Sequence, residues 1–138
     1  MTFKKLEHIT DLRYSTEGKT LDELFENITE ALSDAIYESQ LDKFDERHAI
    51  NLNAKTLDML IHDYIEELIY IANYEYKLFA NSTLHIFFDK ENEQYFLKGF
   101  IGIKNSNKKD YSTEVKACSF SIKLKEKPTY EAEFILDI

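Results

Sequence analysis

Cysteine, proline, glycine and tryptophan are scarce in this sequence. The 138 residues include one cysteine, one proline, three glycines and no tryptophan. A single cysteine, Cys118, excludes an internal disulfide and a cysteine-based zinc site. The low glycine and proline content, with no repetitive or serine-rich segment, argues against a linker and against internal repeats. We therefore expect one domain that covers residues 1–138.

Long apolar runs and an excess of positive charge are also lacking. No apolar run reaches the length of a membrane span, and the N-terminus has no signal-peptide h-region. We therefore expect a soluble, cytoplasmic protein with no membrane partner. The formal net charge is −9, and an acidic surface repels phosphate backbones. We expect no direct nucleic-acid binding; docking onto a basic protein partner fits this charge better.

Two amphipathic helices are indicated by apolar residues at three- and four-residue spacing. The first follows a capping box at Thr20–Glu23 and carries its apolar stripe from Leu21 to Ile36. The second follows an N-cap at Thr56 and carries a broader, more aromatic stripe from Leu57 to Ile69. That breadth predicts a helix buried on more than one side.

The other ordered segments read as strands, because they are rich in β-branched and aromatic residues with a period of two. Short connections between consecutive strands favour antiparallel pairing. We therefore predict an α+β fold, a single compact domain with two amphipathic helices packed on a mainly antiparallel β-sheet. The last strand ends in an apolar run, which predicts a C-terminus tied into the sheet. The predicted strands cover residues 3–9, 11–16, 46–53, 76–79, 84–88, 95–103, 115–124 and 130–138.

Several common active sites are missing from the sequence. It has no glycine-rich phosphate loop, no G-x-S-x-G elbow and no C-x-x-C pair. The histidines are scattered and form no helical i,i+4 pair. His48 and His85 lie in strand alternation, where a structural role is favoured. For His62, on the second predicted helix, we expect a hydrogen-bonded surface histidine.

The pattern that most resembles a site joins the two ends of the chain. Asp11 lies at the edge of one predicted strand, and Asp137 lies one residue before the terminal Ile138. If these strands pair, their carboxylates and the main-chain oxygens of Ile138 supply the hard ligands that Ca²⁺, Mg²⁺ or Mn²⁺ requires. Aspartates at strand ends are also common as turn formers and solvated edge charges. The spacing alone leaves both readings open.

Two further residues belong to this hypothesis. His8 precedes Asp11 by three residues, so it is a candidate for a supporting group beside the metal ligands or for a gate. Lys116 falls inside a predicted strand, where a lysine usually points to solvent and protects an edge. If Lys116 faced the aspartates instead, it would balance their charge or contact a phosphate.

Taken in order, these motifs resemble the archease family. Residues 7–11 read E-H-I-T-D, like the family's E-H-T-A-D, and residues 18–27 resemble its G-x-T-L-E-E-L-F-E-N helix start. Residues 63–70 are similar to its D-W-L-N-E-L-L-Y, and residues 113–117 read T-E-V-K-A as the family does. The closing F-I-L-D-I, residues 134–138, is similar to V-x-L-D-[IL]. The resemblance spans essentially the whole chain.

The resemblance implies a non-catalytic accessory protein of an RNA ligase. Such ligases join 3′-phosphate or 2′,3′-cyclic phosphate ends to 5′-hydroxyl ends in tRNA splicing and RNA repair. Family members stimulate metal-dependent guanylylation of the ligase from GTP and allow multiple turnover. The family's metal ligands carry over to Asp11, Asp137 and Ile138. His8 and Lys116 become residues near the metal or in contact with ligase or nucleotide.

The sequence also departs from the family pattern. After V-K-A the family commonly continues x-T-Y-H, whereas this chain has Cys118-Ser119-Phe120-Ser121. The tyrosine is a phenylalanine here and the histidine is absent. If that histidine contacts the ligase or the nucleotide, its absence implies an activity that is weaker, differently tuned or specialised to a divergent partner. Two alternatives remain open: a small metal-dependent hydrolase that uses the same carboxylates, and a protein-interaction module without a metal.

Overall fold

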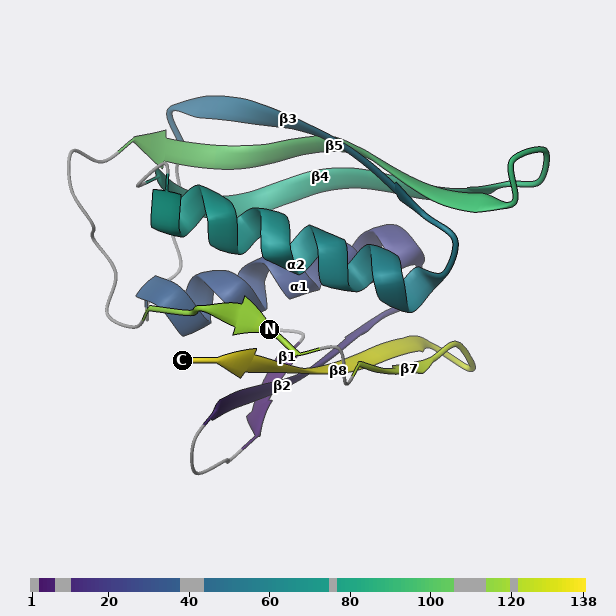
Figure 1. Ribbon diagram of the computed structural model, residues 1–138, viewed down its shortest axis with the longest axis horizontal. Helices are drawn as coiled ribbons and strands as arrows, with labels where there is room; N and C mark the ends of the chain where they lie inside the picture. The colour runs from purple at the N-terminus through teal and green to yellow at the C-terminus, as the bar shows by residue number, and fades with distance from the viewer. Residues whose placement is uncertain (1–2, 7–10, 38–43, 75–76, 106–113, 120–121) are drawn as a thin grey trace.

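The computed structural model describes residues 3–6, 11–37, 44–74, 77–105, 114–119 and 122–138. Two helices form a middle layer with an antiparallel sheet on each side (Figure 1). The elements in chain order are β1 (Phe3–Leu6), β2 (Asp11–Gly18), α1 (Leu21–Tyr37), β3 (Glu46–Ala54), α2 (Leu57–Tyr74), β4 (Lys77–Asp89), β5 (Gln94–Asn105), β6 (Ala117–Cys118), β7 (Lys123–Lys125) and β8 (Tyr130–Asp137).

Both helices begin where the capping residues predict. The Glu23 amide donates to Thr20 Oγ1 at 3.1 Å, and the Met59 amide donates to Thr56 Oγ1 at 3.4 Å. These bonds satisfy amides that have no partner inside the helix. The apolar stripes of α1 and α2 are buried between the sheets. The helix layer is therefore the core on which both sheets pack.

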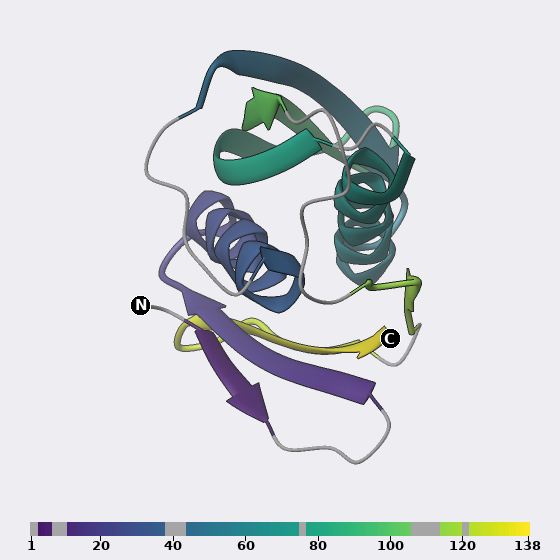
Figure 2. The ribbon, with the colours of Figure 1, turned by 90° about the vertical axis from the view of Figure 1, so that its left-hand side faces the viewer.

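One sheet, which we call the terminal sheet, contains the strands from both ends of the chain. Its order is β1-β2-β8-β6, and β7 also pairs with β8 (Figure 2). β8 is thus the central strand, so the prediction that the C-terminal segment is tied into a sheet is confirmed. Tyr14 of β2 and Phe134 of β8 stack on the side that faces the helices, with their ring centres 6.0 Å apart.

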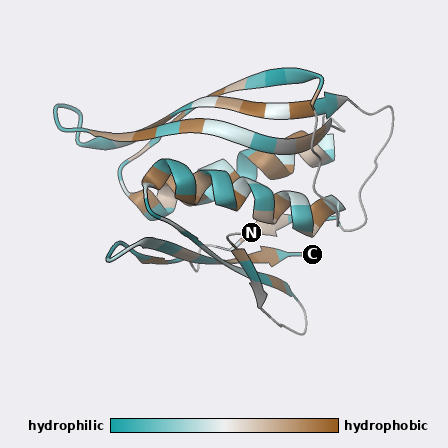
Figure 3. Cartoon of the chain, turned by 180° about the vertical axis from the view of Figure 1, so that it is seen from behind, coloured by the Kyte–Doolittle hydropathy of each residue, from teal (hydrophilic) through white to brown (hydrophobic). Residues whose placement is uncertain are grey.

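The other sheet, which we call the hairpin sheet, has the order β3-β5-β4. β4 and β5 form a long hairpin, and β3 pairs with the far side of β5. Gly99 of β5 has φ +154°, and a side chain there would meet the carbonyl oxygen of Thr83 on β4. Hydrophobic and hydrophilic positions alternate along the strands of this sheet (Figure 3). One face of the sheet therefore packs on the helices and the other faces outward.

The open edge of β4 is covered by acidic side chains of α1. The Leu84 amide donates to Glu26 Oε2 at 3.2 Å, and the Ile86 amide donates to Asp22 Oδ1 at 2.8 Å. Burial raises the pKa of Glu26, against the lowering effect of its bond to Leu84. Covered amides cannot recruit another strand, so this edge is protected against edge-to-edge pairing.

Buried hydroxyls join α1, α2 and the hairpin sheet. Thr29 Oγ1 lies 2.6 Å from the Tyr64 hydroxyl and 2.8 Å from Ser82 Oγ. Burial raises the pKa of Tyr64 to about 12, despite these hydrogen bonds. Thr29 and Tyr64 of this cluster are fully buried.

The α+β fold class is confirmed, but two strand predictions are wrong. Residues 77–79 and 84–88 belong to one continuous strand, β4, with an irregularity between Phe79 and Ser82, and residue 76 lies outside the described residues. The predicted strand 115–124 is instead two short strands, β6 and β7, which pair with successive parts of β8. Within the described part of the chain, no helix is long and apolar enough to cross a membrane.

Candidate metal site at the end of the terminal sheet

Asp11 and Asp137 lie directly opposite each other. They are the terminal residue pair of the antiparallel ladder between β2 and β8. Side chains of such a pair project from the same face, with Cβ atoms about 4.5–5.5 Å apart. The structure therefore brings together the two aspartates that the sequence places 126 positions apart.

The two carboxylates lie on the outer face of the terminal sheet. Their neighbours Leu12 and Leu136 pair with each other, and Leu136 is fully buried against the helix layer. Because successive side chains alternate between faces, Asp11 and Asp137 point the other way. Asp137 is exposed and Asp11 is half-buried. Ile138 follows immediately and is 43% exposed. A ligand could reach this position from solvent.

A third chain segment closes the site on the other side of β8. Ala117 of β6 pairs with Asp137, and the Lys116 amide donates to the Asp137 carbonyl oxygen at 2.7 Å. The Lys116 side chain is exposed, so its backbone, rather than its charge, makes the contact that the structure records. His8, Phe120 and Ser121 lie outside the described residues.

Two side chains of α2 hold β6 in place. The Cys118 amide donates to Glu66 Oε1 at 2.8 Å, and His62 Nε2 lies 3.2 Å from the Cys118 carbonyl oxygen. Glu66 and His62 are one turn apart on the helix, and their side chains lie 3.5 Å from each other. The expected hydrogen bond of His62 is present, but the expected surface position is wrong, since the side chain is only 12% exposed. Sequence reasoning missed Glu66, although its i,i+4 spacing from His62 was a signal.

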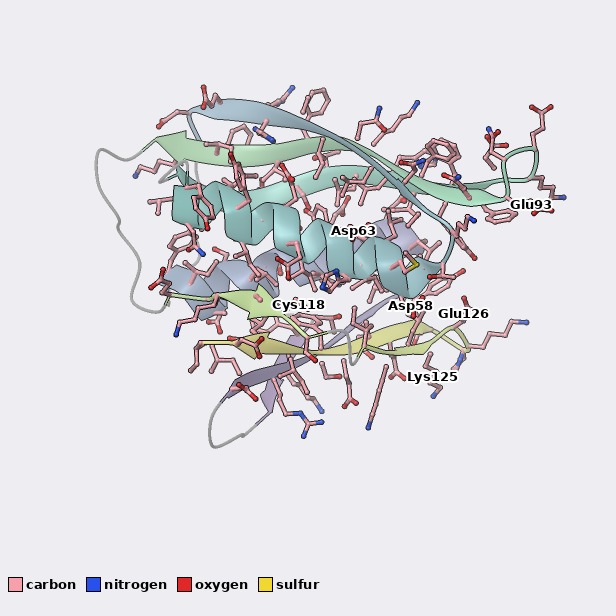
Figure 4. The ribbon with its side chains drawn as sticks, in the orientation of Figure 1. Asp58, Asp63, Glu93, Cys118, Lys125 and Glu126 are labelled. Carbon is pink, nitrogen blue, oxygen red and sulfur yellow. The ribbon has the colours of Figure 1, made fainter. Side chains whose placement is uncertain are left out.

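Cys118 itself faces the helix layer (Figure 4). Burial raises the pKa of the Cys118 thiol to about 12, and the nearby carboxylates of Glu66 and Asp137 add to the effect. A thiol in that state is protonated at neutral pH and is a poor nucleophile. Cys118 therefore acts as a small buried core residue.

The remaining histidines lie away from the aspartates. His48 Nε2 is 4.0 Å from Glu67 Oε1 on α2. His85 on β4 is 70% exposed and lies 3.4 Å from Asp22. Neither joins the site.

The donor chemistry at residues 11 and 137 fits a hard divalent cation. Two carboxylates on one face supply oxygen ligands of the right type. No group of three or more histidine, cysteine, aspartate or glutamate side chains converges anywhere in the described ranges. A bound ion would therefore need further oxygens from the main chain of Ile138, from water or from a partner.

Comparison with known proteins places this three-layer α+β domain in a family. The model of the Archease protein family (MTH1598/TM1083) matches residues 3–138. "Protein archease" of Methanosarcina mazei is 24% identical over 99% of this chain and 95% of its own length. "Protein archease-like" of Dictyostelium discoideum is 27% identical over 91% of this chain and 85% of its own. The chain belongs to the archease family.

A solved structure shares the fold. The solution structure of Methanobacterium thermoautotrophicum protein 1598 superposes with a TM-score of 0.77 and covers 99% of both chains. Its sequence identity to this chain is 23%. The helix layer between antiparallel sheets is therefore common to both proteins.

Proposed function

We propose that this chain is a metal-binding accessory protein that stimulates the guanylylation and multiple turnover of an RNA ligase. The ligase would be of the type that joins 3′-phosphate and 5′-hydroxyl ends in tRNA splicing and RNA repair, with GTP as its nucleotide. The observation that carries this proposal is the pairing of Asp11 with Asp137 in a member of the archease family.

In this proposal Asp11, Asp137 and a main-chain oxygen of Ile138 hold a divalent ion, either Ca²⁺, Mn²⁺ or Mg²⁺. Such an ion would supply positive charge to nucleotide phosphates. The chain's own contribution is to hold the two carboxylates at the exposed end of a sheet. Asp137 is fixed from both sides, by the β2 ladder and by the Lys116 amide. The site is thus preorganised and open to a large partner.

The alternative of a small hydrolase has less support. A hydrolase would need a nucleophile or a general base beside the carboxylates. The Cys118 thiol faces the helix layer and has a raised pKa, and His62 is engaged with β6.

The decisive assay is guanylylation of a purified ligase of this type, with GTP and limiting Mn²⁺. It compares the wild type with Asp11→Ala and Asp137→Ala. The matched control is Glu133→Gln, which removes a carboxylate from the same face of β8 four residues earlier. We expect stimulation by the wild type and the control only.

Two results would revise the proposal. Stimulation by the aspartate variants would keep the ligase partner but move the site elsewhere. No stimulation by any form, with a ligase that responds to its own accessory protein, would mean that this chain has a different role.

A further inference from the structure

The outer face of the hairpin sheet has chemistry that the proposed metal site does not use. Leu97, Ile101 and Ile103 of β5 are fully buried against the helices. The alternate positions, Phe96, Lys98 and Phe100, therefore face outward. In the described part of the chain, no helix or strand covers this face (Figure 1). A set of aromatic side chains is thus left facing solvent.

The aromatic rings on this face are arranged along the sheet. Phe87 of β4 and Phe96 of β5 are cross-strand partners whose rings stack at 5.5 Å with an interplanar angle of 11°. Phe100 follows along β5 and is 46% exposed. The Phe44 ring lies over Gly102, where a side chain on the glycine would come within 2.7 Å of it. We call these rings on the outer face of the sheet the phenylalanine face (Phe44, Phe87, Phe96 and Phe100).

Cations accompany the rings. The Lys98 Nζ lies 6.0 Å from the centre of the Phe87 ring, and the Arg47 guanidinium carbon lies 6.0 Å from the centre of the Phe100 ring. Both side chains are exposed. Cations held over aromatic rings bring positive charge to the same places where a planar ligand would stack.

The carboxylates of this face lie at its two ends. Asp89 lies at the β4–β5 turn, where it accepts hydrogen bonds from Asn92 and from the Glu91 amide. Asp45 lies just before β3, beside the end of β5. His85, on the β4 side, contacts Asp22 of α1. Between those ends the described residues of β3, β4 and β5 place no carboxylate on the outer face. The whole chain has a net charge of −9, so the middle of this face, with its cations and no carboxylate among the described residues, is positive where the protein as a whole is negative.

We propose that the phenylalanine face binds single-stranded RNA. Bases would stack on Phe87, Phe96 and Phe100, and backbone phosphates would lie against Arg47 and Lys98. Aromatic rings with nearby cations form the usual platform for single strands, because unpaired bases expose their flat faces. A duplex hides those faces, so it would not be accepted. The choice of RNA over DNA rests on the proposed function in RNA ligation; the platform itself does not.

This proposal departs from the expectation, drawn from net charge alone, that the protein does not bind nucleic acid. The overall charge weakens long-range attraction, so binding is weak and sensitive to salt. Two phosphate contacts predict a slope of about −1.4 for log K against log salt concentration on a single strand. The slope therefore counts the cations that take part.

The test measures fluorescence anisotropy of a labelled single-stranded RNA of about 10 nucleotides at about 50 mM salt, with the full chain alone. Matched probes are the same sequence as single-stranded DNA and as duplex RNA. The variants are Phe100→Ala and Lys98→Glu. Their controls are Tyr70→Ala, an exposed aromatic on α2, and Lys4→Glu, an exposed lysine on β1. Lys98→Glu and Lys4→Glu change net charge equally, so any difference between them is local.

We expect Phe100→Ala to weaken binding by about 5- to 150-fold, the range found when a stacking aromatic is removed. Lys98→Glu should weaken binding and flatten the salt slope, while both controls bind like the wild type. RNA-induced shifts of backbone amide resonances should fall on β3, β4 and β5. These shifts locate the site without any substitution.

Several outcomes would overturn the proposal. No binding of single strands at low salt would do so, and so would equal binding of duplex RNA. Equal loss in Lys98→Glu and Lys4→Glu would show general repulsion instead of a site. If Phe100→Ala kept its RNA affinity but lost ligase stimulation, the face would be a protein interface. Because the binding assay contains no ligase, its result is separate from that of the guanylylation assay.

Discussion

The outer face of the terminal sheet carries charged side chains in cross-strand pairs, whereas the outer face of the hairpin sheet carries phenylalanine rings. In the terminal sheet, Lys125 and Glu131 lie 3.4 Å apart, and Lys123 is opposite Glu133. A pocket of about 350 Å³ opens among these residues. Figure 4 labels Lys125 at the turn into β8.

The two faces differ in whether their exposed side chains would gain free energy from binding a partner. Exposed ion pairs are stable in water and contribute little to folding. Exposed aromatic surface gains free energy only when something covers it. The two proposals give the two faces different partners: a cation and a ligase at the end of the terminal sheet, and a stacking ligand on the hairpin sheet. The following predictions test whether the two sheets are one unit and whether they divide the functions in this way.

Among single substitutions, the largest expected effect comes from removing a core aromatic from either sheet. Phe79→Ala removes a fully buried ring that meets Tyr37 at 5.4 Å, and Phe134→Ala removes the partner of Tyr14. Each should lower the free energy of unfolding by about 3–5 kcal/mol, because both sheets pack on the same helix layer. Urea titration should show one transition with an unchanged m-value in both variants. A smaller m-value for Phe134→Ala alone would mean that the terminal sheet unfolds separately.

Metal binding should stabilise the wild type. A ligand that binds only the folded state adds about 2.7 kcal/mol at a concentration 100 times its Kd. Asp137→Asn should abolish the rise in melting temperature caused by Mn²⁺ or Ca²⁺, and Glu133→Gln should retain it. A rise that persists in Asp137→Asn would move the ion away from residues 11 and 137. Phe100→Ala should also retain it, since the hairpin sheet takes no part.

Alkaline pH should destabilise the protein because two buried groups, the Cys118 thiol of the terminal sheet and the Tyr64 hydroxyl of α2, resist ionisation in the folded state. The pKa of the Cys118 thiol is raised from 9.0 to about 12, and that of Tyr64 is raised from 10.0 to about 12. The unfolded chain loses these protons first, so stability is fully present below pH 9 and falls as pH rises from 9 to 12. Each group contributes a slope of about 1.4 kcal/mol per pH unit within its own window.

Urea midpoints measured across this range provide the check. Cys118→Ala should remove the part of the fall that begins at pH 9, and leave the part that Tyr64 causes above pH 10. If the native thiol ionised near pH 9, as followed by its ultraviolet absorbance, the account of Cys118 would be incorrect.

The smallest effect concerns the contact between α2 and β6. Glu66→Gln keeps an oxygen that can accept from the Cys118 amide but removes its charge. The cost should be about 1 kcal/mol, the difference between a hydrogen bond to a charged group and one to a neutral group. Hydrogen exchange at the Cys118 amide should become faster. Glu67→Gln, the next residue on α2, should leave that exchange rate unchanged. Equal rates in both variants would show that β6 is held by its pairing with β8 alone.

Local errors in the predicted strands have identifiable causes. The polar residues Asn81 and Ser82 read as a break between two strands. In the structure the Ser82 hydroxyl bonds to Thr29 of α1, so β4 continues through an irregularity. The apolar run from Val115 to Leu124 reads as one strand, but its two ends pair with different parts of β8. His62 reads as a surface residue because its acceptor, the Cys118 carbonyl, is 56 positions away.

The sequence by itself determined the two helices, their caps and the α+β class, because these depend on local periodicity and on residues within one turn. It also pointed to Asp11 and Asp137 as a pair, and the register of β2 and β8 confirms that they meet; that they bind a metal remains a prediction. Only the tertiary structure decided that the strands divide into two sheets with opposite outer faces. Strand pairing depends on contacts between residues far apart in the chain, which no local pattern records.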